Sequence, residues 1–238
     1  MRRKTNSIIL AMCFIALMFC CHSAIASPYE DFDFDDITYW VGEGENQAAF
    51  VVDWWDGKEP ECLVWGYRWD GEATGEDMIV ALVGNGTASS GTYAGGFSGA
   101  DSRLYATLVY YSGLGYALTG LGYDLDNDGF EYDPGAEPGE TGYPADIDDH
   151  YVEGWYSGYW SYWLSDNDSD WSYSGYGLSN RTLSDGSWDG WSFSNTAAMG
   201  AGSAPPTPTA AEAPVPIPGA IWLLGGGLIG IIGMRRKN

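Results

Sequence analysis

Residues 62–83 read CLVWGYRWDGEATGEDMIVALV, and this stretch decides the fold. Between residues 62 and 69, large apolar side chains occupy every second position, which is typical of a half-buried strand. Asp70-Gly71 then indicates a turn. Thr74 stands three residues before Asp77, so the pair predicts a capping box at a helix start, and the apolar run up to Gly84 predicts the helix itself. We therefore expect one helix packed on a sheet.

The rest of the chain is richer in strands than in helices. Short runs of aromatic and β-branched residues predict further strands at 49–55, 103–111, 116–123, 158–163, 170–173 and 188–193. Two stretches rich in Gly and polar residues, 84–99 and 124–150, are predicted as loops. The fold class expected for residues 27–196 is a single α+β domain dominated by antiparallel strands with one packed helix.

The order of these elements resembles a known domain. The helix is followed by the Gly-Leu-Gly-Tyr strand ending at Tyr123, the aromatic strand 159–163, Gly175, and Leu183-Ser184-Asp185-Gly186 leading to 191–193. This order is similar to the β-grasp-like C-terminal domain of cobalamin carriers. The resemblance implies a β-grasp-like fold and a ligand such as a corrinoid or another flat ring system.

Residues 1–26 have the pattern of a signal peptide. Basic Arg2-Arg3-Lys4 precedes an apolar stretch from Ile8 to about Cys21, and Ala24 and Ala26 form an A-x-A site. The apolar run is too short for a comfortable membrane span. We therefore expect signal peptidase to remove this segment during export.

Residues 215–238 predict a membrane segment with a basic tip. Val215, Pro216, Pro218 and Gly219 open a nearly apolar stretch that reaches Met234, and it is followed by the basic residues Arg235, Arg236 and Lys237. About 20 residues at 1.5 Å each give roughly 30 Å, the thickness of a hydrocarbon core. Positive charge after the span favours the cytoplasmic side, so the preceding domain would lie outside. From the pattern alone, an ordinary single-pass anchor is an alternative to a processed tail.

The same tail resembles the PEP-CTERM class of sorting signals in its VPLPA-type variant. The resemblance implies recognition by an exosortase in a Gram-negative bacterium that makes exopolysaccharide, and a location in the cell envelope, at the outer surface or in the extracellular matrix. The domain also resembles a group of sorting-tagged exported proteins with no assigned activity, through Val51-Val52-Asp53-Trp54, Leu63 to Gly71 and Thr74 to Met78.

Between residues 27 and 204, four basic residues face 32 acidic ones, a net charge of −28. This charge disfavours nucleic acid as a partner and attracts divalent cations. After removal of the signal, Cys62 is the single cysteine, so no intrachain disulfide is expected. Residues 197–214 are Ala, Pro, Thr and Gly for the most part, which predicts an extended tether.

Asp124, Asp126 and Asp128, followed by Gly129, match the first half of a calcium loop. Gly135 stands where such a loop has a bidentate Glu, so Glu131, Asp133 or Glu137 would complete the ligand set. The alternative is a solvated acidic turn without an ion.

The aromatic residues suggest a binding surface. Paired tryptophans on a strand point to opposite faces, so some rings can pack in the core while others form a platform for sugars or a flat ligand. The candidates for this platform are Trp54, Trp55, Trp65, Trp160 and Trp163.

Evidence for catalysis in the sequence is thin. His150 is the only histidine after the signal, which excludes a multi-histidine metal centre. We therefore expect a non-catalytic surface or matrix protein that binds extracellular material such as exopolysaccharide. The alternatives are a corrinoid-like or carbohydrate-binding protein and, as a third class, an extracellular hydrolase.

Overall fold

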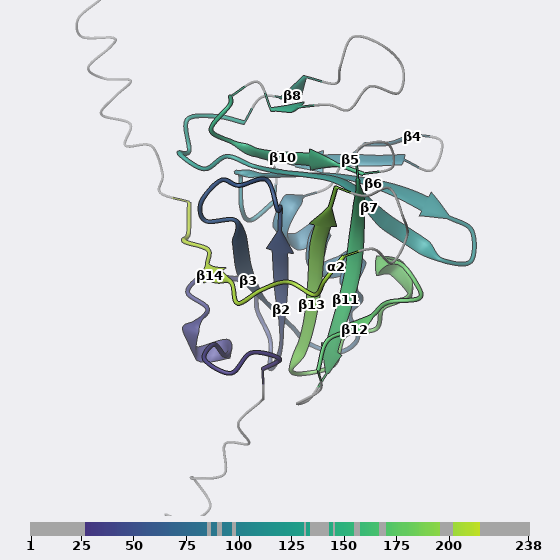
Figure 1. Cartoon of the computed structure of the whole chain (residues 1–238). Helices are drawn as coiled ribbons and strands as arrows, with labels where there is room; N and C mark the ends of the chain where they lie inside the picture. The colour runs from purple at the N-terminus through teal and green to yellow at the C-terminus, as the bar shows by residue number, and fades with distance from the viewer. Residues whose placement is uncertain are drawn as a thin grey trace, which may run out of the picture.

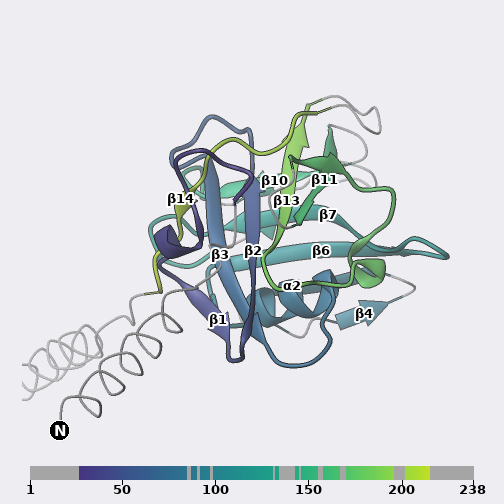
Figure 2. The same cartoon turned by 90° about the horizontal axis from the view of Figure 1, so that it is seen from below.

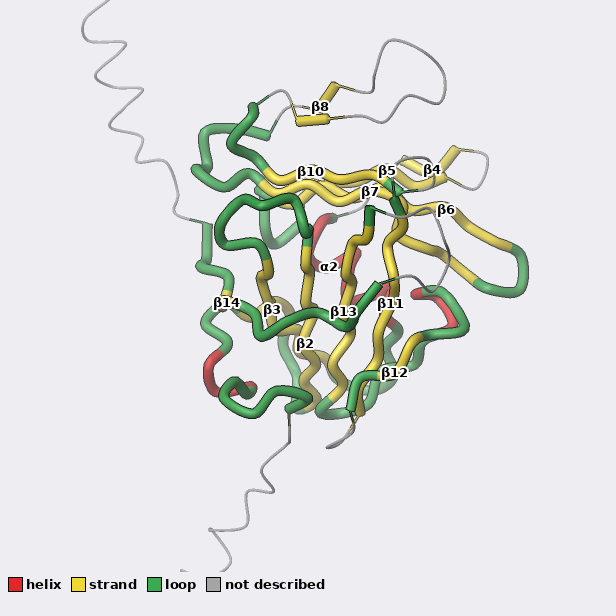
Figure 3. Tube along the Cα trace, in the orientation of Figure 1, coloured by secondary structure: helices red, strands yellow, loops and turns green. Residues whose placement is uncertain are grey.

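Two β-sheets enclose α2 (Gly75–Val83) in this computed structural model. The structure describes residues 27–84, 87–89, 92–96, 99–130, 132–133, 143–144, 146–154, 158–166, 170–195 and 202–214. Within these residues the chain is rich in strands, has one α-helix and contains mixed sheets, as expected for an α+β domain of mostly β character. Figure 3 shows the main sheet upright, the second sheet across its upper end and α2 behind the main sheet.

The main sheet has a parallel pair at its centre. Its strand order is β1-β3-β2-β13-β11-β12, formed by Trp40–Gly42, Cys62–Trp69, Asn46–Asp53, Ser187–Ser194, Tyr159–Asp166 and Ser172–Tyr173. β2 pairs with β13 in parallel, from Ala48 opposite Ser187 to Asp53 opposite Ser192. The β2–β3 and β11–β13 pairs are antiparallel, whereas β1 runs parallel to β3. The two central strands therefore come from opposite ends of the domain sequence.

The second sheet lies across one end of the main sheet (Figure 1). Its order is β10-β7-β6-β5-β4, formed by His150–Glu153, Gly115–Tyr123, Leu104–Tyr111, Thr92–Gly96 and Thr87–Ser89, with every pair antiparallel. A short pair, β8 (Tyr132–Asp133) and β9 (Tyr143–Pro144), lies in the predicted loop 124–150. The prediction that 84–99 is all loop was wrong, because β4 and β5 extend the antiparallel ladder of β6 there.

The helix begins where the capping box predicted. Thr74 Oγ1 accepts a bond from Asp77 N at 3.2 Å, and the Asp77 carboxylate accepts one from Thr74 N at 2.8 Å. At the other end, the carbonyls of Ala81 and Leu82 accept from the backbone of residues 100 and 101. α2 buries one face in a cluster shared by the main sheet, β6 and β7, to which it contributes Met78, Ile79, Leu82 and Val83. Figure 2 shows the helix alongside this inner side of the sheet.

The outer face of the main sheet is also covered. Phe34 of the 3₁₀-helix η1 (Phe34–Asp36) and Ile37 pack with Val64 and Trp188 in a second, smaller core. β3 is therefore buried on both faces for most of its length, and the prediction of a half-buried strand was wrong. The acidic lead-in before residue 40 supplies the apolar cover that the alternating pattern could not reveal.

The C-terminal segment 202–214 is docked on the domain. β14 (Thr209–Ala210) pairs in parallel with β3, Ala211 N donates to Val64 O at 2.9 Å, and Thr38 Oγ1 donates to Ala211 O at 2.8 Å. The prediction of a free tether was therefore wrong for residues 202–214. The physical reason is that pairing along a strand edge needs backbone groups rather than apolar bulk, and small side chains fit closely there.

The predicted signal peptide and sorting tail lie outside the described residues. Within the part of the chain that the structure describes, no helix is both long and apolar enough to cross a bilayer.

The docked segment depends on a glycine. A Cβ atom at Gly190 would lie 2.7 Å from Pro205 Cγ and 2.9 Å from the Trp171 ring. We expect Gly190→Ala to lower the free energy of unfolding by about 1–3 kcal/mol, because this packing has no room for a methyl group. Protease cleavage within 202–214 should also become faster. Urea unfolding tests the effect against Gly175→Ala, whose Cβ meets no atom within 4 Å. Equal stability of both variants would contradict the close docking.

Candidate functional site

An aromatic pocket lies between the β6–β7 hairpin and the end strands of the main sheet. Its volume is about 370 Å³. The lining comes from the hairpin (Tyr111 to Thr119), from Gly154 and from β11, β13 and the segment after β12. Seven aromatic side chains dominate it: Tyr111, Tyr159, Trp160, Tyr162, Tyr173, Tyr176 and Trp191. Pockets for small ligands occupy roughly 300–1,000 Å³, so this one suits a compact ligand.

The inner wall of the pocket is a packed aromatic layer. Tyr162 and Trp191 are register partners on β11 and β13, and their rings stack with centroids 4.2 Å apart and an interplanar angle of 8°. Trp160, one pleat away on the same face of β11, meets Phe193 edge to face at 5.4 Å. Trp160 Nε1 also donates to Val152 O at 3.3 Å. These contacts fix the ring positions before any ligand arrives.

The rim carries the exposed tyrosines. Tyr173 is 40% exposed and Tyr176 is 43% exposed, which is high for large side chains beside a cavity. The hydroxyls of Tyr159 and Tyr173 lie 3.0 Å apart and share one hydrogen bond. One hydroxyl of the pair donates this bond, which joins β11 to β12 at the rim of the pocket.

Two glycines let the rim segment approach the hairpin. Gly177 N donates to Leu114 O at 2.7 Å, and a Cβ atom at Gly177 would lie 2.1 Å from Tyr116 O. Gly115 has φ +83° and faces Ser179, whose Oγ accepts a bond from Tyr116 N at 2.9 Å. The segment from Ser174 to Asn180 is thereby held against the hairpin, which closes one side of the pocket.

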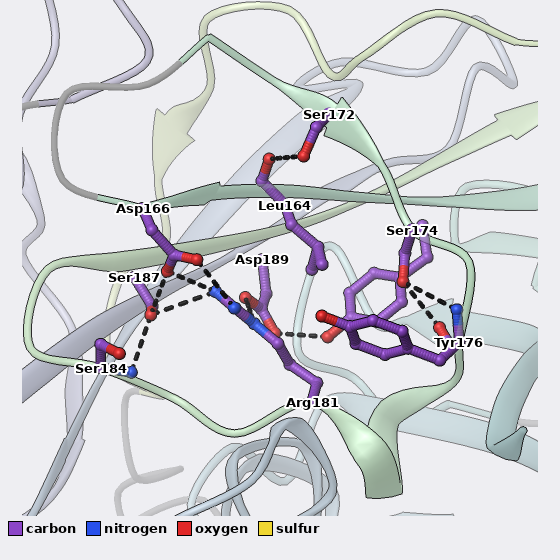
Figure 4. Close-up of polar contacts among 10 residues, drawn as sticks. Leu164, Asp166, Ser172, Ser174, Tyr176, Arg181, Ser184, Ser187 and Asp189 are labelled. Atoms are coloured by element: carbon purple, nitrogen blue, oxygen red, sulfur yellow. Dashed lines mark hydrogen bonds and ion pairs between the residues drawn. The ribbon is translucent and has the colours of Figure 1, made fainter.

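A buried ionic network supports the inner wall from behind (Figure 4). The Arg181 guanidinium donates to both Asp166 oxygens, at 2.9 and 2.6 Å, and to Asp189 Oδ1 at 3.1 Å. Ser187 Oγ donates to Asp166 at 2.6 Å. Tyr162, whose ring lines the pocket, donates its hydroxyl proton to Asp189 Oδ2. The network therefore fixes the orientation of a pocket ring.

The pKa shifts follow this geometry. Burial alone would lower the pKa of Arg181, but its bonds to Asp166 and the charges of both carboxylates raise it. Burial opposes ionisation of Asp166, yet the bonds from Arg181 and Ser187 bring its pKa below the usual value. Asp189 is fully buried, and burial raises its pKa despite Arg181. Asp166 and Asp189 share the Arg181 guanidinium. Asp166 accepts more hydrogen bonds from Arg181 and Ser187, so its pKa is the lower of the two.

The pocket itself offers no general acid or base of ordinary pKa. None of its lining residues is Asp, Glu, His, Cys, Lys or Arg. Burial raises the pKa of Tyr159 and of Tyr162 further above the usual value. Burial also raises the pKa of Asp53 to about 6, but Asp53 bonds Ser192 at 2.8 Å and does not line the pocket. The arrangement is suited to binding a neutral ring compound.

The tryptophans predicted as a platform separate into different environments. Trp54 and Trp65 are fully buried, so neither can stack on an external ligand; Trp54 instead stacks on His150 at 4.4 Å. Trp55 is 53% exposed but does not line the pocket, and Trp163 packs edge to face on Tyr173. Trp160 is the one predicted platform residue in the lining. The tyrosines were missed, although the run Tyr173-Ser174-Gly175-Tyr176-Gly177 carried their signal.

The acidic loop after β7 brings three of the predicted residues close together. Asp124, Asp126 and Asp128 bring carboxylate oxygens within 4.8 Å of one another. Glu131 is outside the described residues, and for Asp133 the structure describes the backbone in β8 alone. These three aspartates are the candidates for holding a cation.

The remaining predicted residues do not join the pocket. His150 is buried, with Nδ1 2.9 Å from Asp56 and Nε2 3.2 Å from Pro60 O, so both its nitrogens face structural acceptors. Cys62 is buried and free, as expected for a small apolar residue. The sorting and processing residues lie outside the described part of the chain: Ala24, Ala26, Val215, Pro216, Pro218, Gly219, Arg235, Arg236 and Lys237.

The fold and the pocket together give a strand-rich α+β domain with an aromatic pocket where its two sheets meet. Comparison of the chain with protein families, with curated proteins and with solved structures gives no match.

The ionic network makes a sharp prediction. We expect Arg181→Met to lower the free energy of unfolding by about 3–5 kcal/mol, because Asp189 would remain buried without its cation. Adding Asp189→Asn should restore part of the loss, since the amide oxygen still accepts from Tyr162. Urea unfolding measures both, with Arg68→Met, at a partly exposed position near the end of β3, as the control. The role of the network would be refuted if Arg181→Met cost no more than the control.

Proposed function

We propose that this chain is an exported, non-catalytic binding protein of the cell envelope whose aromatic pocket takes a neutral ring compound. The single observation that carries the proposal is the pocket of seven aromatic rings with no charged residue in its lining. Aromatic faces bury rings well, and tyrosine hydroxyls add directional bonds at the edge.

Sugar residues of an extracellular polysaccharide are the ligand class that we favour. A pyranose has apolar faces that stack on aromatic rings and hydroxyls around its edge that need hydrogen-bond partners. The inner wall provides aromatic faces through Trp160 and Tyr162. The exposed rim tyrosines, Tyr173 and Tyr176, provide hydroxyl groups. An uncharged lining within so acidic a chain selects against anionic sugars.

A flat tetrapyrrole-like ring is the second candidate, favoured by the topology. The strand order β3-β2-β13-β11, with the central pair parallel and α2 across one face, supports a β-grasp-like core. A cavity of about 370 Å³ is small for an entire corrin macrocycle. A corrinoid would therefore bind with only part of its ring system inside.

Tryptophan fluorescence distinguishes the two ligand classes. Trp160 and Trp191 line the pocket, so an occupying ligand should change their emission. We expect neutral hexasaccharides of glucose, mannose, galactose or N-acetylglucosamine to change it with a saturable dependence on concentration. Saturable quenching by cobalamin beyond the inner-filter effect, with no response to any sugar, would support the second candidate instead. No saturable response to either class would refute the proposal.

A matched pair of variants locates the binding. Tyr176→Ala removes an exposed ring from the rim and should weaken binding at least about tenfold, the equivalent of roughly 1.4 kcal/mol. Tyr110→Ala removes an equally exposed ring that does not line the pocket, and it should leave affinity unchanged. Equal affinities of the two variants would place the ligand elsewhere.

Export and sorting rest on the sequence patterns at the two ends. We propose that signal peptidase removes residues 1–26 and that an exosortase handles the tail 215–238, which delivers the domain to the outer surface or matrix. Residues 202–214, which directly precede the Pro216 motif in the sequence, dock on the domain.

Replacing the three basic residues Arg235, Arg236 and Lys237 by Ala tests the sorting proposal. The tail should then no longer be processed, because the positive tip that orients the segment is gone. Mass spectrometry and cell fractionation would show a heavier chain retained in the inner membrane. Unchanged mass and location of the triple variant would contradict exosortase handling. Lys58→Ala, which removes a basic residue outside the tail, is the control and should alter neither mass nor location.

A further inference from the structure

We propose that residues 202–214, here called the strap, are an exchangeable proline-rich ligand, and that the surface beneath the strap accepts the same segment from a second copy of the chain. The strap follows β13 in the sequence, and Figure 1 shows it crossing the main sheet to reach β14. Its strand β14 pairs with β3. All the other strands that the structure describes precede the strap, so their pairings are made by residues upstream of it.

The strap buries every third residue. Pro205, Pro208 and Ala211 are buried, whereas the residues between them are exposed or half-buried. A period of three is that of polyproline II, and Pro205 and Pro208 have the P-x-x-P spacing with which proline-rich ligands meet aromatic surfaces. The strap therefore docks with the periodicity of a bound proline-rich ligand.

An aromatic surface receives the first of these prolines. A Cβ atom at Gly190 would lie 2.7 Å from Pro205 Cγ and 2.9 Å from the Trp171 ring, so the proline and the indole both pack closely over this glycine. The ring of Tyr29 lies 5.8 Å from that of Trp171. Two aromatic rings and a bare backbone position thus surround the place where Pro205 docks.

The surface also supplies hydrogen-bond donors to the strap. Four side chains outside the strap donate to its backbone carbonyls: Tyr29 to Pro205 O at 3.3 Å, Cys62 to Pro206 O at 3.6 Å, Thr38 to Ala211 O at 2.8 Å and Arg103 to Glu212 O. Prolines carry a carbonyl but no N–H, so a surface that offers donors suits a proline-rich segment. Because these bonds go to backbone oxygens, the surface recognises the backbone and the buried prolines rather than polar side chains of the strap.

The edge of β3 explains why the occupant is a second copy of the strap. Leu63 and Val64 pair with β14, and Val64 O accepts a bond from Ala211 N at 2.9 Å. If the strap leaves, these backbone groups become an open strand edge, which is a template for another chain. The strap of a second copy carries both the pairing residues and the buried prolines, so it fits the whole surface.

Exchange of an identical element between copies is a low-cost route to assembly, because it creates no new contact. Within one chain, the covalent link raises the local concentration of the strap, so each copy holds its own strap when copies are dilute. Crowding of many copies favours exchange. The strap would then join neighbouring domains to one another.

The alkylation rate of Cys62 measures whether the strap is docked. Cys62 is 7% exposed and its thiol faces Pro206 O, so an undocked strap should uncover it. In the full-length chain, Pro205→Glu combined with Pro208→Glu puts charge on the two buried prolines and should speed alkylation by N-ethylmaleimide at least about tenfold. The matched control, Pro206→Glu combined with Thr207→Glu, adds equal charge at exposed positions and should leave the rate unchanged. Peptide mass spectrometry assigns the label to Cys62.

A fluorescent peptide of residues 202–214 tests exchange between copies. In mild detergent, anisotropy should show saturable binding to the Pro205→Glu/Pro208→Glu chain. The control chain should bind at least about tenfold more weakly, because its own strap competes. The same peptide with Pro205→Glu and Pro208→Glu should not bind. An excess of unlabelled Gly190→Ala chain should displace the peptide, since its strap no longer fits its own surface.

Four outcomes would overturn the proposal. Equal alkylation rates of the open and control chains would show that the strap does not cover Cys62. Faster alkylation without peptide binding at up to about 1 mM, the effective concentration that a short linker gives, would show that the surface takes no segment in trans. Equal binding of the two peptides would exclude proline recognition, and failure of the Gly190→Ala chain to compete would exclude a second copy as the occupant. Ala211→Glu, with the exposed Ala213→Glu as its control, repeats the measurements in case the double variant does not fold.

Discussion

The parallel pairing of β2 and β13 is the constraint on which the rest of the structure depends. It joins residues 46–53 to residues 187–194, so the domain closes only when both ends of its sequence are in place. Both central strands are buried on both faces, so other parts of the chain must cover each face of the main sheet. The inner face receives α2 and the second sheet, and the outer face receives the segments before β1 and after β13. In the sheet, β11 lies beside β13. The pocket forms where β11 meets the β6–β7 hairpin of the second sheet.

Local chemistry was predictable from the sequence, but long-range closure was not. The Thr74 capping box predicted the helix start because its bonds span three residues. The limits of β3 followed from the alternating pattern of residues 62–69 in the same way. The partner of β2 did not, since strand order depends on contacts far apart in sequence. Composition was misleading for residues 202–214, because Pro205 and Ala211 are small enough to bury against Gly190 and Val64.

The candidate site shows the same difference between local contacts, which the sequence predicts, and long-range contacts, which it does not. Trp54 and Trp65 looked like surface platform residues because alternation suggests one solvent face, whereas both faces of the main sheet are covered. The aromatic rings of the pocket come from positions between Tyr111 on β6 and Trp191 on β13, so only the fold could assemble them. The acidic loop was visible as a motif, whereas Asp149 became its neighbour through strand pairing. Sequence patterns find the parts of a site that are contiguous and miss the parts that a sheet brings together.

The pocket and the acidic loop after β7 differ in charge: the pocket lining is uncharged, whereas the loop carries three aspartates. All four cations between residues 27 and 204 are engaged: Arg103 with Asp101, Arg181 with Asp166 and Asp189, Arg68 over the Trp40 ring, and Lys58 with Asp56. None of them neutralises the acidic loop, whose charge therefore remains available to a cation from solution. β7 connects this loop to the pocket, with Leu118 and Thr119 in the lining and Asp124 just after its last residue, roughly 17 Å away at 3.4 Å per residue. β10 repeats the connection in the opposite direction, from Asp149 to Gly154. These two paired strands therefore join the acidic end of the second sheet directly to one wall of the pocket.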